Sequence, residues 1–433
     1  MEKNKKDPNE KSYRSSAFNH YIEKERLVFN TNSTSLIQLN EEQFSDIQRD
    51  LFEHFSFEEI NSLKQMGFIV PPVDEFEVIE RRRENKFKKE SSKFGFTILT
   101  TTNCNARCPY CYEEGIKHKD ASPETIENIK RLILKNRDKQ ISVSWFGGEP
   151  LFNAKMIDEI SSFMNVNKIN YSSSIVTNGY LADKWIGKFV DWRIRNVQIT
   201  LDGVGQIYNK VKRYIYHQEE NAFDKVINNI SMLLNKNIRV AIRLNFDKNN
   251  YQEIIDCIEF LKKRFNNHKK LYVYANHIFG PKESYHLDDG TNLYYLITKK
   301  LMECGFVKKL YDLRITHKDY FCFVSNPNHV VIDPNGDFFL CEHYVINKDI
   351  GSVGSINQGY INQKNYKFWS SLDYPYKKCY NCNYLPMCQG GCKSESLKEY
   401  PDSCCLSYLD CLDNILVDYY HMKEQETEQN ENH

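Results

Sequence analysis

Short apolar runs alternate with amphipathic stretches through the middle of the chain. The stretches have helical spacing, and one of them follows Ser122 as N-cap and Pro123 at its first position. The runs have the length and composition of β-strands and lie at residues 96–100, 141–145, 173–176, 197–201, 240–245 and 271–275. Strands that alternate with helices predict an α/β fold with a parallel sheet over residues 93–281. Such sheets hold their chemistry in loops at the carboxyl ends of the strands.

The pattern before this block predicts a small α+β domain at residues 17–90. Two strands, 25–29 and 35–39, flank a turn-rich segment, and a helix is expected after Asn40. A second helix begins at Ser56, which opens a capping box. The domain contains no obvious catalytic residues.

The remaining segments lack sustained periodicity. Residues 1–16 and 423–433 are charged and poor in apolar side chains, so we predict both to be disordered. Residues 283–422 are rich in Cys, Tyr, Asn and Gly. That composition is expected of a domain organised around metal sites.

Charge and cysteine content narrow the class of protein. Lys+Arg and Asp+Glu each total 58 in 433 residues, which predicts no nucleic-acid partner. The one basic run, 81–89, alternates with Glu and is expected to be a solvated helix face. We find no signal peptide and no apolar stretch long enough to span a membrane, so we expect a cytoplasmic protein without a membrane partner. Cytoplasmic thiols stay reduced, so the 14 cysteines are expected to be metal ligands rather than disulfides.

The first cysteine motif follows the first predicted strand. Cys104, Cys108 and Cys111 have the spacing C-x3-C-x2-C on one loop, which suits three irons of a [4Fe–4S] cluster. The missing fourth thiolate leaves one iron open to a substrate or cofactor. A zinc site is the alternative, but zinc calls for a fourth protein ligand nearby.

Glycines and polar residues follow the next three predicted strands. The motifs are, in order, Gly147-Gly148-Glu149, Thr177-Asn178-Gly179 and Leu201-Asp202-Gly203. Glycines let the backbone approach a ligand closely, and the Glu149 carboxylate can accept hydrogen bonds from an ammonium group. Together with the cysteine loop, these motifs predict a ligand lying across one edge of the sheet.

This combination of motifs resembles the radical S-adenosylmethionine (SAM) superfamily. The resemblance implies a partial (β/α)6 barrel in which the open iron binds the amine and carboxylate of SAM. Gly147, Gly148 and Glu149 match the motif that holds the amine. The further cofactor contacts implied on later strands are Ser174, Thr177, Asn178, Asp202 and Arg243. The implied chemistry is reductive cleavage of SAM to a 5′-deoxyadenosyl radical, which removes a hydrogen from the substrate.

A second group of cysteines lies in residues 283–422. Cys322, Gly336 and Cys341 have the spacing C-x13-G-x4-C. Cys379, Cys382, Cys388 and Cys392 have the spacing C-x2-C-x5-C-x3-C, and Cys404, Cys405 and Cys411 form a third group. The spacing alone leaves a zinc ribbon open. Behind a radical SAM core it resembles the SPASM domain, which carries two auxiliary [4Fe–4S] clusters.

The SPASM resemblance implies a ligand set for each auxiliary cluster. The ligands implied for the first cluster are Cys322, Cys341 and Cys392. Those implied for the second are Cys379, Cys382 and Cys388, with a fourth ligand from the group Cys404, Cys405 and Cys411. We favour Cys405 over Cys404 and Cys411, because the sequence from Cys405 to Tyr408 matches the usual family ending. Many family members have one more cysteine where this chain has Thr316-His317-Lys318. The first auxiliary cluster therefore has an open iron, or recruits His317, Cys304 or a spare thiol.

Three functions follow from these resemblances. We favour a peptide maturase that installs a thioether or carbon–carbon cross-link in a ribosomally made precursor peptide. Residues 17–90 resemble a winged-helix-like leader-recognition domain, to whose sheet edge a leader peptide would add as a strand. The expected partners are this leader and an electron donor of the flavodoxin or ferredoxin kind.

The alternative enzyme is an anaerobic sulfatase maturase, which makes formylglycine. The stretch from Leu340 to Val345 resembles that family, with Glu342 at the position of its catalytic Asp base. The third function is a non-catalytic iron–sulfur or zinc scaffold, which would leave the Gly147–Glu149 motif without a purpose.

Overall fold

The computed structural model of the chain describes residues 13–89, 92–216, 221–278, 292–319, 322–397 and 405–431. The chain divides into two compact units, each assembled from separate segments. The terminal unit contains residues 1–86, 309–321 and 373–433, and the sheet unit contains residues 87–308 and 322–372.

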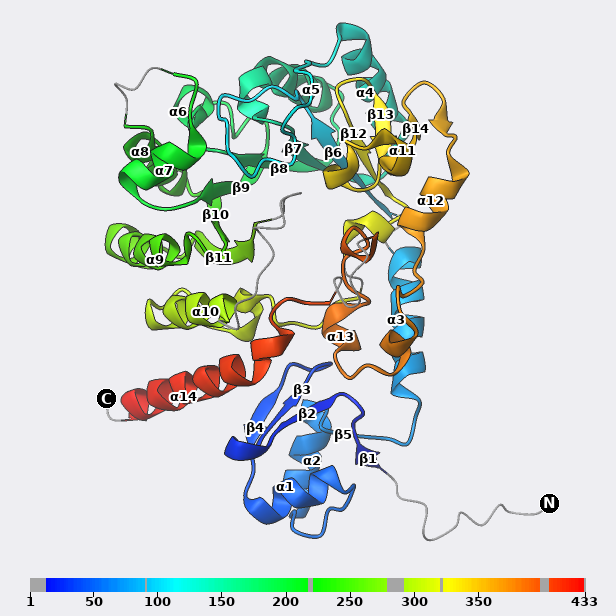
Figure 1. Cartoon of the computed structure of the whole chain (residues 1–433). Coiled ribbons are helices and arrows are strands. Elements are labelled where there is room, and N and C mark those ends of the chain that lie inside the picture. The colour runs from blue at the N-terminus through cyan, green and yellow to red at the C-terminus, as the bar shows by residue number, and fades with distance from the viewer. Residues whose placement is uncertain are drawn as a thin grey trace, which may run out of the picture. The chain divides into compact units, whose positions relative to one another are not determined.

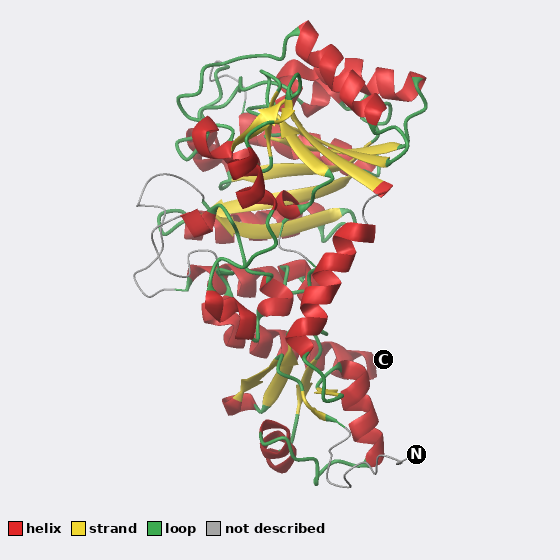
Figure 2. Ribbon diagram, turned by 90° about the vertical axis from the view of Figure 1, so that its right-hand side faces the viewer, coloured by secondary structure: helices red, strands yellow, loops and turns green. Residues whose placement is uncertain are grey.

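A ten-stranded sheet organises the sheet unit (Figures 1 and 2). Six neighbouring strands are parallel and follow one another in sequence: β6 (Lys93–Leu99), β7 (Gln140–Phe146), β8 (Tyr171–Thr177), β9 (Ile194–Leu201), β10 (Arg239–Phe246) and β11 (Leu271–His277). All six strands predicted from the apolar runs are present. The prediction of an α/β fold with a parallel sheet is confirmed.

Helices follow the parallel strands in the predicted alternation. They are α4 (Pro123–Lys135), α5 (Ala154–Val166), α6 (Ala182–Trp185), α7 (Gly205–Lys212), α8 (Ala222–Asn235), α9 (Tyr251–Phe265) and α10 (Leu293–Glu303). Strand residues of one parity, such as Val197, Ile199 and Leu201, are fully buried, because period-two alternation places them on one face of the sheet. The alternate positions, among them Ser174 and Arg243, are only partly buried and form a polar face.

The sheet continues beyond β6 with strands from much later in the chain. They are β12 (His329–Ile332), β13 (Asp337–Phe339), β14 (Ser352–Ser355) and β15 (Gly359–Tyr360), with helices α11 (Lys348–Gly351) and α12 (Gln363–Ser370). β12 pairs with β6 in parallel, with His329 opposite Gly95. Residues 322–372 therefore belong to the sheet unit, and the predicted domain 283–422 is not one compact body.

The terminal unit begins with a three-stranded antiparallel sheet. Its strands β2 (Asn19–Ile22), β3 (Leu27–Asn30) and β4 (Leu36–Gln38) lie in sequence order. Helix α1 (Glu41–Gln48) is capped by Asn40, and α2 (Phe57–Met66) has the capping box expected at Ser56. Strand β2 was not predicted, because four residues with two inward positions give too short a pattern.

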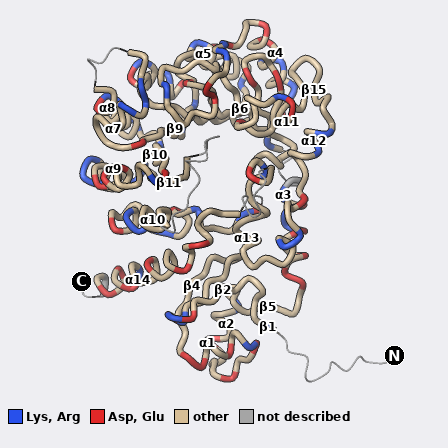
Figure 3. The backbone as a smooth tube through the Cα atoms, viewed as in Figure 1, with Lys and Arg blue, Asp and Glu red and all other residues tan. Residues whose placement is uncertain are grey.

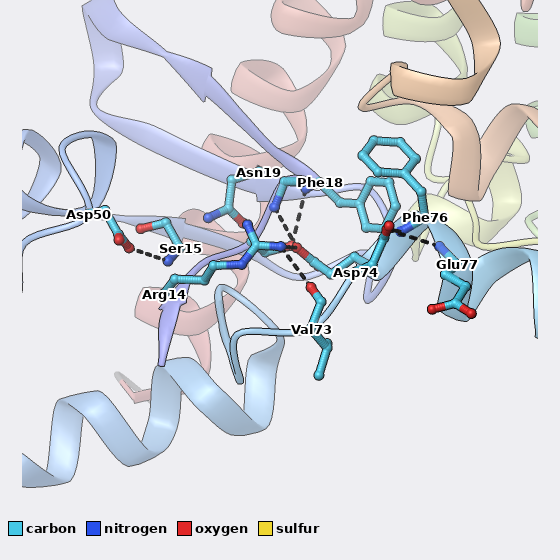
Figure 4. Close-up of polar contacts among 12 residues, drawn as sticks. Arg14, Ser15, Phe18, Asn19, Asp50, Val73, Asp74, Phe76 and Glu77 are labelled. Atoms are coloured by element: carbon cyan, nitrogen blue, oxygen red, sulfur yellow. Dashed lines mark hydrogen bonds and ion pairs between the residues drawn. The ribbon is translucent and has the colours of Figure 1, made fainter. Parts of the chain in front are cut away.

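A two-residue strand pair ties the start of the described chain to this domain. β1 (Arg14–Ser15) pairs with β5 (Ile69–Val70), and Arg14 donates from Nη2 to the Val73 carbonyl at 2.9 Å (Figure 4). The Ser15 amide donates to Asp50 Oδ1 at 2.6 Å. Disorder to residue 16 was therefore predicted too far along the chain; residues 1–12 lie outside the described residues.

Helix α3 (Glu75–Lys89) carries the basic run. Asp74 Oδ1 caps it by accepting from the amides of Phe76 and Glu77 (Figure 4). Lys, Arg and Glu residues are interspersed along it, as Figure 3 shows. The solvated-face prediction was wrong for Arg83, which is 4% exposed with its guanidinium 4.1 Å from the centre of the Tyr374 ring.

The C-terminal part of the chain completes the terminal unit. Helix α13 (Leu385–Cys388) lies in the Cys-rich segment, and α14 (Leu412–Glu431) follows it. His20 Nε2 is 2.6 Å from Asp413 Oδ1, and the Tyr420 hydroxyl donates to Gln38 Oε1, so α14 contacts the β2–β4 sheet. Disorder from residue 423 was also wrong, because α14 is helical to Glu431. No helix in the described ranges is both long and apolar enough to cross a membrane.

Candidate active site

The three cysteines of the first motif lie on the loop that follows β6. Each thiol is partly buried, and the Ala106 amide donates to Cys104 Sγ at 3.3 Å. Burial raises the pKa of Cys104 to about 12 and that of Cys111 to about 11, and the neighbouring thiols add to both shifts. The three thiols are therefore close enough to affect one another electrostatically. Metal binding would deprotonate them, because the thiolate is the ligand form.

The donor set fits an iron–sulfur cluster better than a single ion. Among the residues that the structure describes, no three His, Cys, Asp or Glu side chains converge on one metal position. A [4Fe–4S] cluster distributes its thiolates over separate irons, so its ligands stand around a larger volume. Three cysteines on one loop, with an amide donor to the sulfur of Cys104, are compatible with that requirement.

Gly147 and Gly148 hold the cysteine loop against the end of β7. The Gly148 amide donates to the Thr101 carbonyl at 3.0 Å, and the Glu149 amide donates to the Asn103 carbonyl at 2.9 Å. A Cβ at Gly147 would lie 2.2 Å from the Thr101 carbonyl oxygen, and one at Gly148 would lie 2.5 Å from that of Asn103. Gly147 also has φ +118°, which L side chains rarely adopt. The close approach found here is to the chain's own loop; contact of the glycines with SAM stays a prediction.

Glu149 is fully buried and joins two strand ends. Its Oε1 accepts from the Thr177 hydroxyl at 2.7 Å and from the Leu151 amide at 3.0 Å, while Oε2 accepts from the Asn178 amide at 2.8 Å. Burial raises the pKa of this carboxyl, and these hydrogen bonds oppose the rise. Thr177 is thus engaged within the protein. A carboxylate has about four acceptor sites, so an ammonium contact remains compatible.

Asn178 reaches from β8 to the cysteine loop. Its Nδ2 donates to Asn105 Oδ1 at 2.7 Å and lies 4.0 Å from Cys104 Sγ. Its Oδ1 accepts from the Tyr180 amide at 3.0 Å. The amide therefore braces the loop beside the first cysteine.

Asp202, at the end of β9, has an internal partner that the sequence did not reveal. Its Oδ2 lies 2.7 Å from Nζ of Lys212, the last residue of α7, and the Tyr110 hydroxyl donates to both carboxylate oxygens at 2.8 Å. Asp202 is 0% exposed and the Lys212 side chain 3%. A lysine at the end of an amphipathic helix gives no sequence signal for burial.

The polar face of the sheet brings further predicted residues towards the cysteine loop. Arg243 donates from Nε to Asn245 Oδ1 at 2.8 Å. Burial lowers the pKa of His343 to about 4, and the charge of Arg243 adds to that shift. Glu342 and His343 lie in a short 3-10 helix, and the His343 ring packs on Tyr112 with centres 4.8 Å apart. Burial raises the pKa of Glu342, and Arg243 opposes that rise. Ser174 lies opposite Ser144 and Asn196 on the neighbouring strands of the same sheet.

Comparison with known families agrees with this arrangement. The radical SAM superfamily matches residues 98–261, from the end of β6 into α9. Residues 98–261 are a radical SAM domain. This domain makes the protein an enzyme that acts by radical chemistry. Radical SAM domains bind SAM and a [4Fe–4S] cluster.

Similar proteins extend beyond the radical SAM domain. The chain is 24% identical over 412 residues to the radical SAM cyclopropyl synthase TigE of Paramaledivibacter caminithermalis, covering 84% of this chain and 83% of that protein. It is 25% identical over 337 residues to a cysteine-type anaerobic sulfatase-maturating enzyme of Clostridium novyi, covering 70% and 88%. The structure of Streptococcus suis SuiB bound to precursor peptide SuiA covers 91% of this chain and 100% of its own, with a TM-score of 0.52 and 17% identity. The last likeness shows a shared fold.

Outside the radical SAM domain, four cysteines of the terminal unit, Cys379, Cys382, Cys388 and Cys405, interact electrostatically. Burial raises the pKa of the Cys379 thiol, and Cys382 and Cys405 raise it further. Burial, together with Cys405, Cys382 and Cys379, raises the pKa of Cys388 to about 12. Cys411 instead is 1% exposed and donates from Sγ to the Tyr408 carbonyl. The ligand set, with Cys405 as its fourth member, stays a prediction, and Cys404 lies outside the described residues.

The cysteines assigned to the first auxiliary cluster belong to different units. Cys322 and Cys341 are in the sheet unit, and Cys392 is in the terminal unit, so this set stays a prediction. Of the substitutes considered, His317 lies 3.2 Å from Arg82 and 3.3 Å from Asp319.

Cys304, the other substitute considered, ends helix α10 in the sheet unit. Burial raises the pKa of its thiol, and the charges that act on it come from Lys300, Glu259, Glu303 and Lys262. No disulfide forms among the described cysteines.

Proposed function

We propose that this enzyme is a peptide maturase that installs a cross-link in a ribosomally made precursor peptide, with a thioether as the favoured bond. It binds the leader of the peptide at the N-terminal domain and modifies the core peptide at the radical SAM domain. The observation that carries the proposal is the edge of β4, which pairs with no strand of the described residues, in a sheet followed by two capped helices. SuiB, which shares the fold over 91% of this chain, is described in complex with its precursor peptide.

The backbone of β4 is prepared to accept a further strand. The Asn30 amide donates to the Ser35 carbonyl, and the Leu39 amide donates to the Arg26 carbonyl. These hydrogen bonds flank the paired residues of β3 and β4. Hydrogen-bonded pairs alternate along an antiparallel ladder, so Leu36 and Gln38 direct their N–H and C=O groups away from β3. No described strand pairs with that edge. An extended leader would hydrogen-bond there by strand addition.

The radical SAM domain supplies the chemistry. When bound, SAM and the reduced cluster supply the radical that removes a substrate hydrogen. The chain's own contribution is to hold the cysteine loop through Gly148 and Glu149 and to present Glu342 and Arg243 on the polar side of the sheet. Closing a thioether removes one hydrogen from carbon and one from a thiol, so the product is two hydrogens lighter and has one fewer free thiol.

A carbon–carbon link is the alternative bond. The similarity to a cyclopropyl synthase favours it, because a cyclopropyl ring is closed by carbon–carbon bonds. The favoured thioether rests on the missing cysteine at Thr316–Lys318, which would leave an auxiliary iron free to bind a substrate thiolate, a soft ligand that iron–sulfur centres prefer. Mass spectrometry after thiol alkylation distinguishes the two: a product two hydrogens lighter in which every cysteine still alkylates rules out the thioether.

The β4 edge gives the test of leader binding. In Gln38→Pro the outward N–H is lost while the β3–β4 hydrogen bonds remain, because Gln38 does not bond to β3. We expect binding of a fluorescent precursor peptide to weaken about fivefold, the value of one hydrogen bond of about 1 kcal/mol. Uncoupled SAM cleavage should be unchanged. Gln38→Ala is the matched control, because it keeps the N–H but removes the contacts with Tyr420 and the Glu25 carbonyl.

Equal peptide affinity in the proline variant and the alanine control would overturn leader binding at this edge. A short Cys-rich or repeat-bearing reading frame next to the gene for this chain would supply the precursor for the test.

A second candidate is sulfatase maturation. The similarity to the C. novyi maturating enzyme and the position of Glu342 beside Cys341 favour it. A synthetic peptide carrying a sulfatase-type cysteine decides between the two functions. Formylglycine in the product, detected by hydrazide labelling, would replace the cross-linking proposal.

We further propose a cytoplasmic location, where thiols stay reduced, and a flavodoxin-like or ferredoxin-like electron donor.

A further inference from the structure

Exposed apolar and basic side chains lie together on helices α11 and α12 of the sheet unit. The members of this surface, called the α11–α12 patch, are the apolar residues Ile346, Ile350 and Phe368 and the basic residues Lys348, Lys364 and Lys367. The three apolar side chains are 47%, 40% and 38% exposed, in that order, and the three lysines are exposed as well. Apolar groups left in water beside charged ones are typical of a surface that binds another protein.

Side chains of α12 fix the position of α11, so the patch is one continuous surface. Asn365 donates from Nδ2 to the Asp349 and Ser352 carbonyls, both at 2.9 Å. Trp369 donates from Nε1 to the Ile350 carbonyl at 3.0 Å, and Figure 1 shows the two helices as neighbours. These hydrogen bonds satisfy backbone groups of the α11 segment, so the two helices cannot separate without losing them.

The patch is positively charged. Residues 346–370 contain three lysines and a single acidic residue, Asp349. Lys348 pairs with Asp337 of β13, whereas Lys364 and Lys367 lie one turn apart on the exposed side of α12. A partner that buries this surface would therefore have to present acidic side chains around an apolar centre, because like charges repel at an interface.

Aromatic rings connect the patch to the segment that carries Cys341. The Phe368 ring packs edge-on against Trp369 with centres 5.0 Å apart, and the Trp369 ring packs against Tyr344 with centres 4.8 Å apart. The Tyr344 amide donates to the Cys341 carbonyl at 3.2 Å. Trp369 is 0% exposed, so water does not interrupt this series of contacts. Cys341 is a predicted ligand of the first auxiliary cluster.

We propose that the α11–α12 patch is the docking surface for the electron donor of this enzyme, a small acidic flavodoxin-like protein. The inference rests on the electron donor in the proposed function, since reductive cleavage of SAM consumes one electron from outside the chain. On docking, the anionic flavin hydroquinone is oxidised to the neutral semiquinone, and an iron–sulfur centre of the enzyme is reduced by that electron. No proton changes partner in this step. Electron-transfer partners form small, transient interfaces, which a patch on two short helices can supply.

The test compares two reductants on the full-length enzyme with all its clusters and without a peptide. Flavodoxin hydroquinone has to dock, whereas dithionite is a small ion that does not. Lys364→Glu combined with Lys367→Glu should weaken flavodoxin binding, measured by calorimetry, about tenfold at low salt. Flavodoxin-driven formation of 5′-deoxyadenosine should slow by a similar factor, and dithionite-driven formation should be unchanged. Raising the ionic strength should slow the flavodoxin reaction of the native enzyme more than that of the variant, because salt screens the attraction.

Lys210 and Lys236 provide the matched control, because both are exposed and lie in and after the helices that follow β9, whereas β13 and β14 lie beyond β6 in the sheet. Lys210→Glu combined with Lys236→Glu should keep the native affinity for flavodoxin. Equal affinity in the patch variant and this control would overturn the proposal, as would a native enzyme that does not bind flavodoxin.

Two further outcomes are distinguished by the same proteins. If the glutamate variant also loses dithionite-driven cleavage, its fold is damaged, and Lys364→Gln combined with Lys367→Gln decides with a smaller change of charge. Weaker binding of a precursor peptide at unchanged flavodoxin affinity would assign the patch to the peptide and overturn the proposal. Because the assay contains no peptide, an error in the proposed cross-linking function leaves its result standing.

Discussion

Glu149 and Asp202 illustrate how buried carboxylates are used in this enzyme. Each is 0% exposed, and each is held by groups from another segment of the radical SAM domain. An unsatisfied buried carboxylate costs far more than a satisfied one gains, so the hydrogen bonds that each of these two accepts are structural requirements. Glu149 joins the ends of β7 and β8 through Thr177 and Asn178, and Asp202 joins the end of β9 to the cysteine loop through Tyr110.

At the same scale, Gly148 makes a sharp prediction. A Cβ at this position would lie 2.5 Å from the Asn103 carbonyl oxygen, closer than real Cβ contacts. Gly148→Ala should displace the cysteine loop at a cost of about 1–3 kcal/mol. We expect one cluster's worth of iron to be lost and 5′-deoxyadenosine production to fall. Gly187→Ala is the control, because its Cβ would meet nothing within 4 Å. Iron content by colorimetric assay decides, and equal iron in both variants would contradict the steric argument.

Cys405 and Cys411 form a second residue-scale pair. Cys405 acts electrostatically on Cys379, Cys382 and Cys388, whereas the Cys411 thiol is committed to the Tyr408 carbonyl. We expect Cys405→Ala to lose about four irons of the roughly 12 predicted for three clusters, while Cys411→Ala keeps them. Mössbauer spectroscopy with iron quantification measures this directly. Loss of a cluster in Cys411→Ala alone would reverse the assignment.

In the sheet unit, the pairing of strands that are far apart in the chain cannot be read from the sequence pattern. Strand β12 has an apolar run like the strands before it, yet it pairs with β6, more than 200 residues earlier, and extends the sheet on that side. This pairing carries the segment that contains Cys341 and Glu342 alongside the radical SAM domain. The segment after β12 therefore contributes to the site through topology rather than through sequence proximity.

In the connection between helices α1 and α2, an Asp–His pair predicts that local stability depends on pH. Asp46 Oδ2 accepts from the His54 amide and lies 2.9 Å from His54 Nδ1. Burial would raise the pKa of Asp46, but these His54 hydrogen bonds lower it overall, and the Asp46 hydrogen bond raises that of His54. The Asp46 contribution is complete above about pH 4 and lost as pH falls through its folded pKa. The His54 contribution is complete below about pH 6.5 and lost as pH rises through its folded pKa.

We therefore expect amide protection in residues 51–55 to be greatest between these limits. Hydrogen exchange with correction for intrinsic rates measures it, and Asp46→Asn should remove the dependence at both ends. Protection that varies with pH as strongly in Asp46→Asn as in the native chain would exclude this pair as the cause.

On the scale of the whole molecule, the terminal unit combines the two ends of the chain around one core. Phe18 and Ile79 pack with Tyr374, Cys379 and Leu385 in a single buried cluster. The Thr31 hydroxyl also donates to the Asn383 carbonyl. The proposed leader-binding domain and the second cysteine group therefore stabilise each other.

This shared core predicts that the N-terminal domain cannot be removed without damage to the cysteine group. Phe18→Ala should destabilise the terminal unit by about 3–5 kcal/mol and lower its iron content, because Phe18 is fully buried beside Cys379. Phe57→Ala is the matched control, since Phe57 is 77% exposed. Thermal unfolding and iron analysis measure both effects. Full iron content in Phe18→Ala would show that the two ends are independent.

The sequence alone determined the features that depend on local pattern. The six parallel strands, the caps at Asn40 and Ser56 and the C-x3-C-x2-C loop are readable because side-chain periodicity, capping and ligand spacing act over a few residues. The radical SAM assignment followed from motifs placed after successive strands, whose ends a parallel sheet brings to one edge.

Tertiary structure decided what depends on contacts between distant segments. The burial of Lys212, the pairing of β12 with β6 and the order of the tail in α14 all arise from packing across tens to hundreds of residues. A lysine in an amphipathic helix and a charged C-terminal segment look solvated in isolation. Their environment exists only once the chain has folded, because burial and charge pairing are set by neighbours in space.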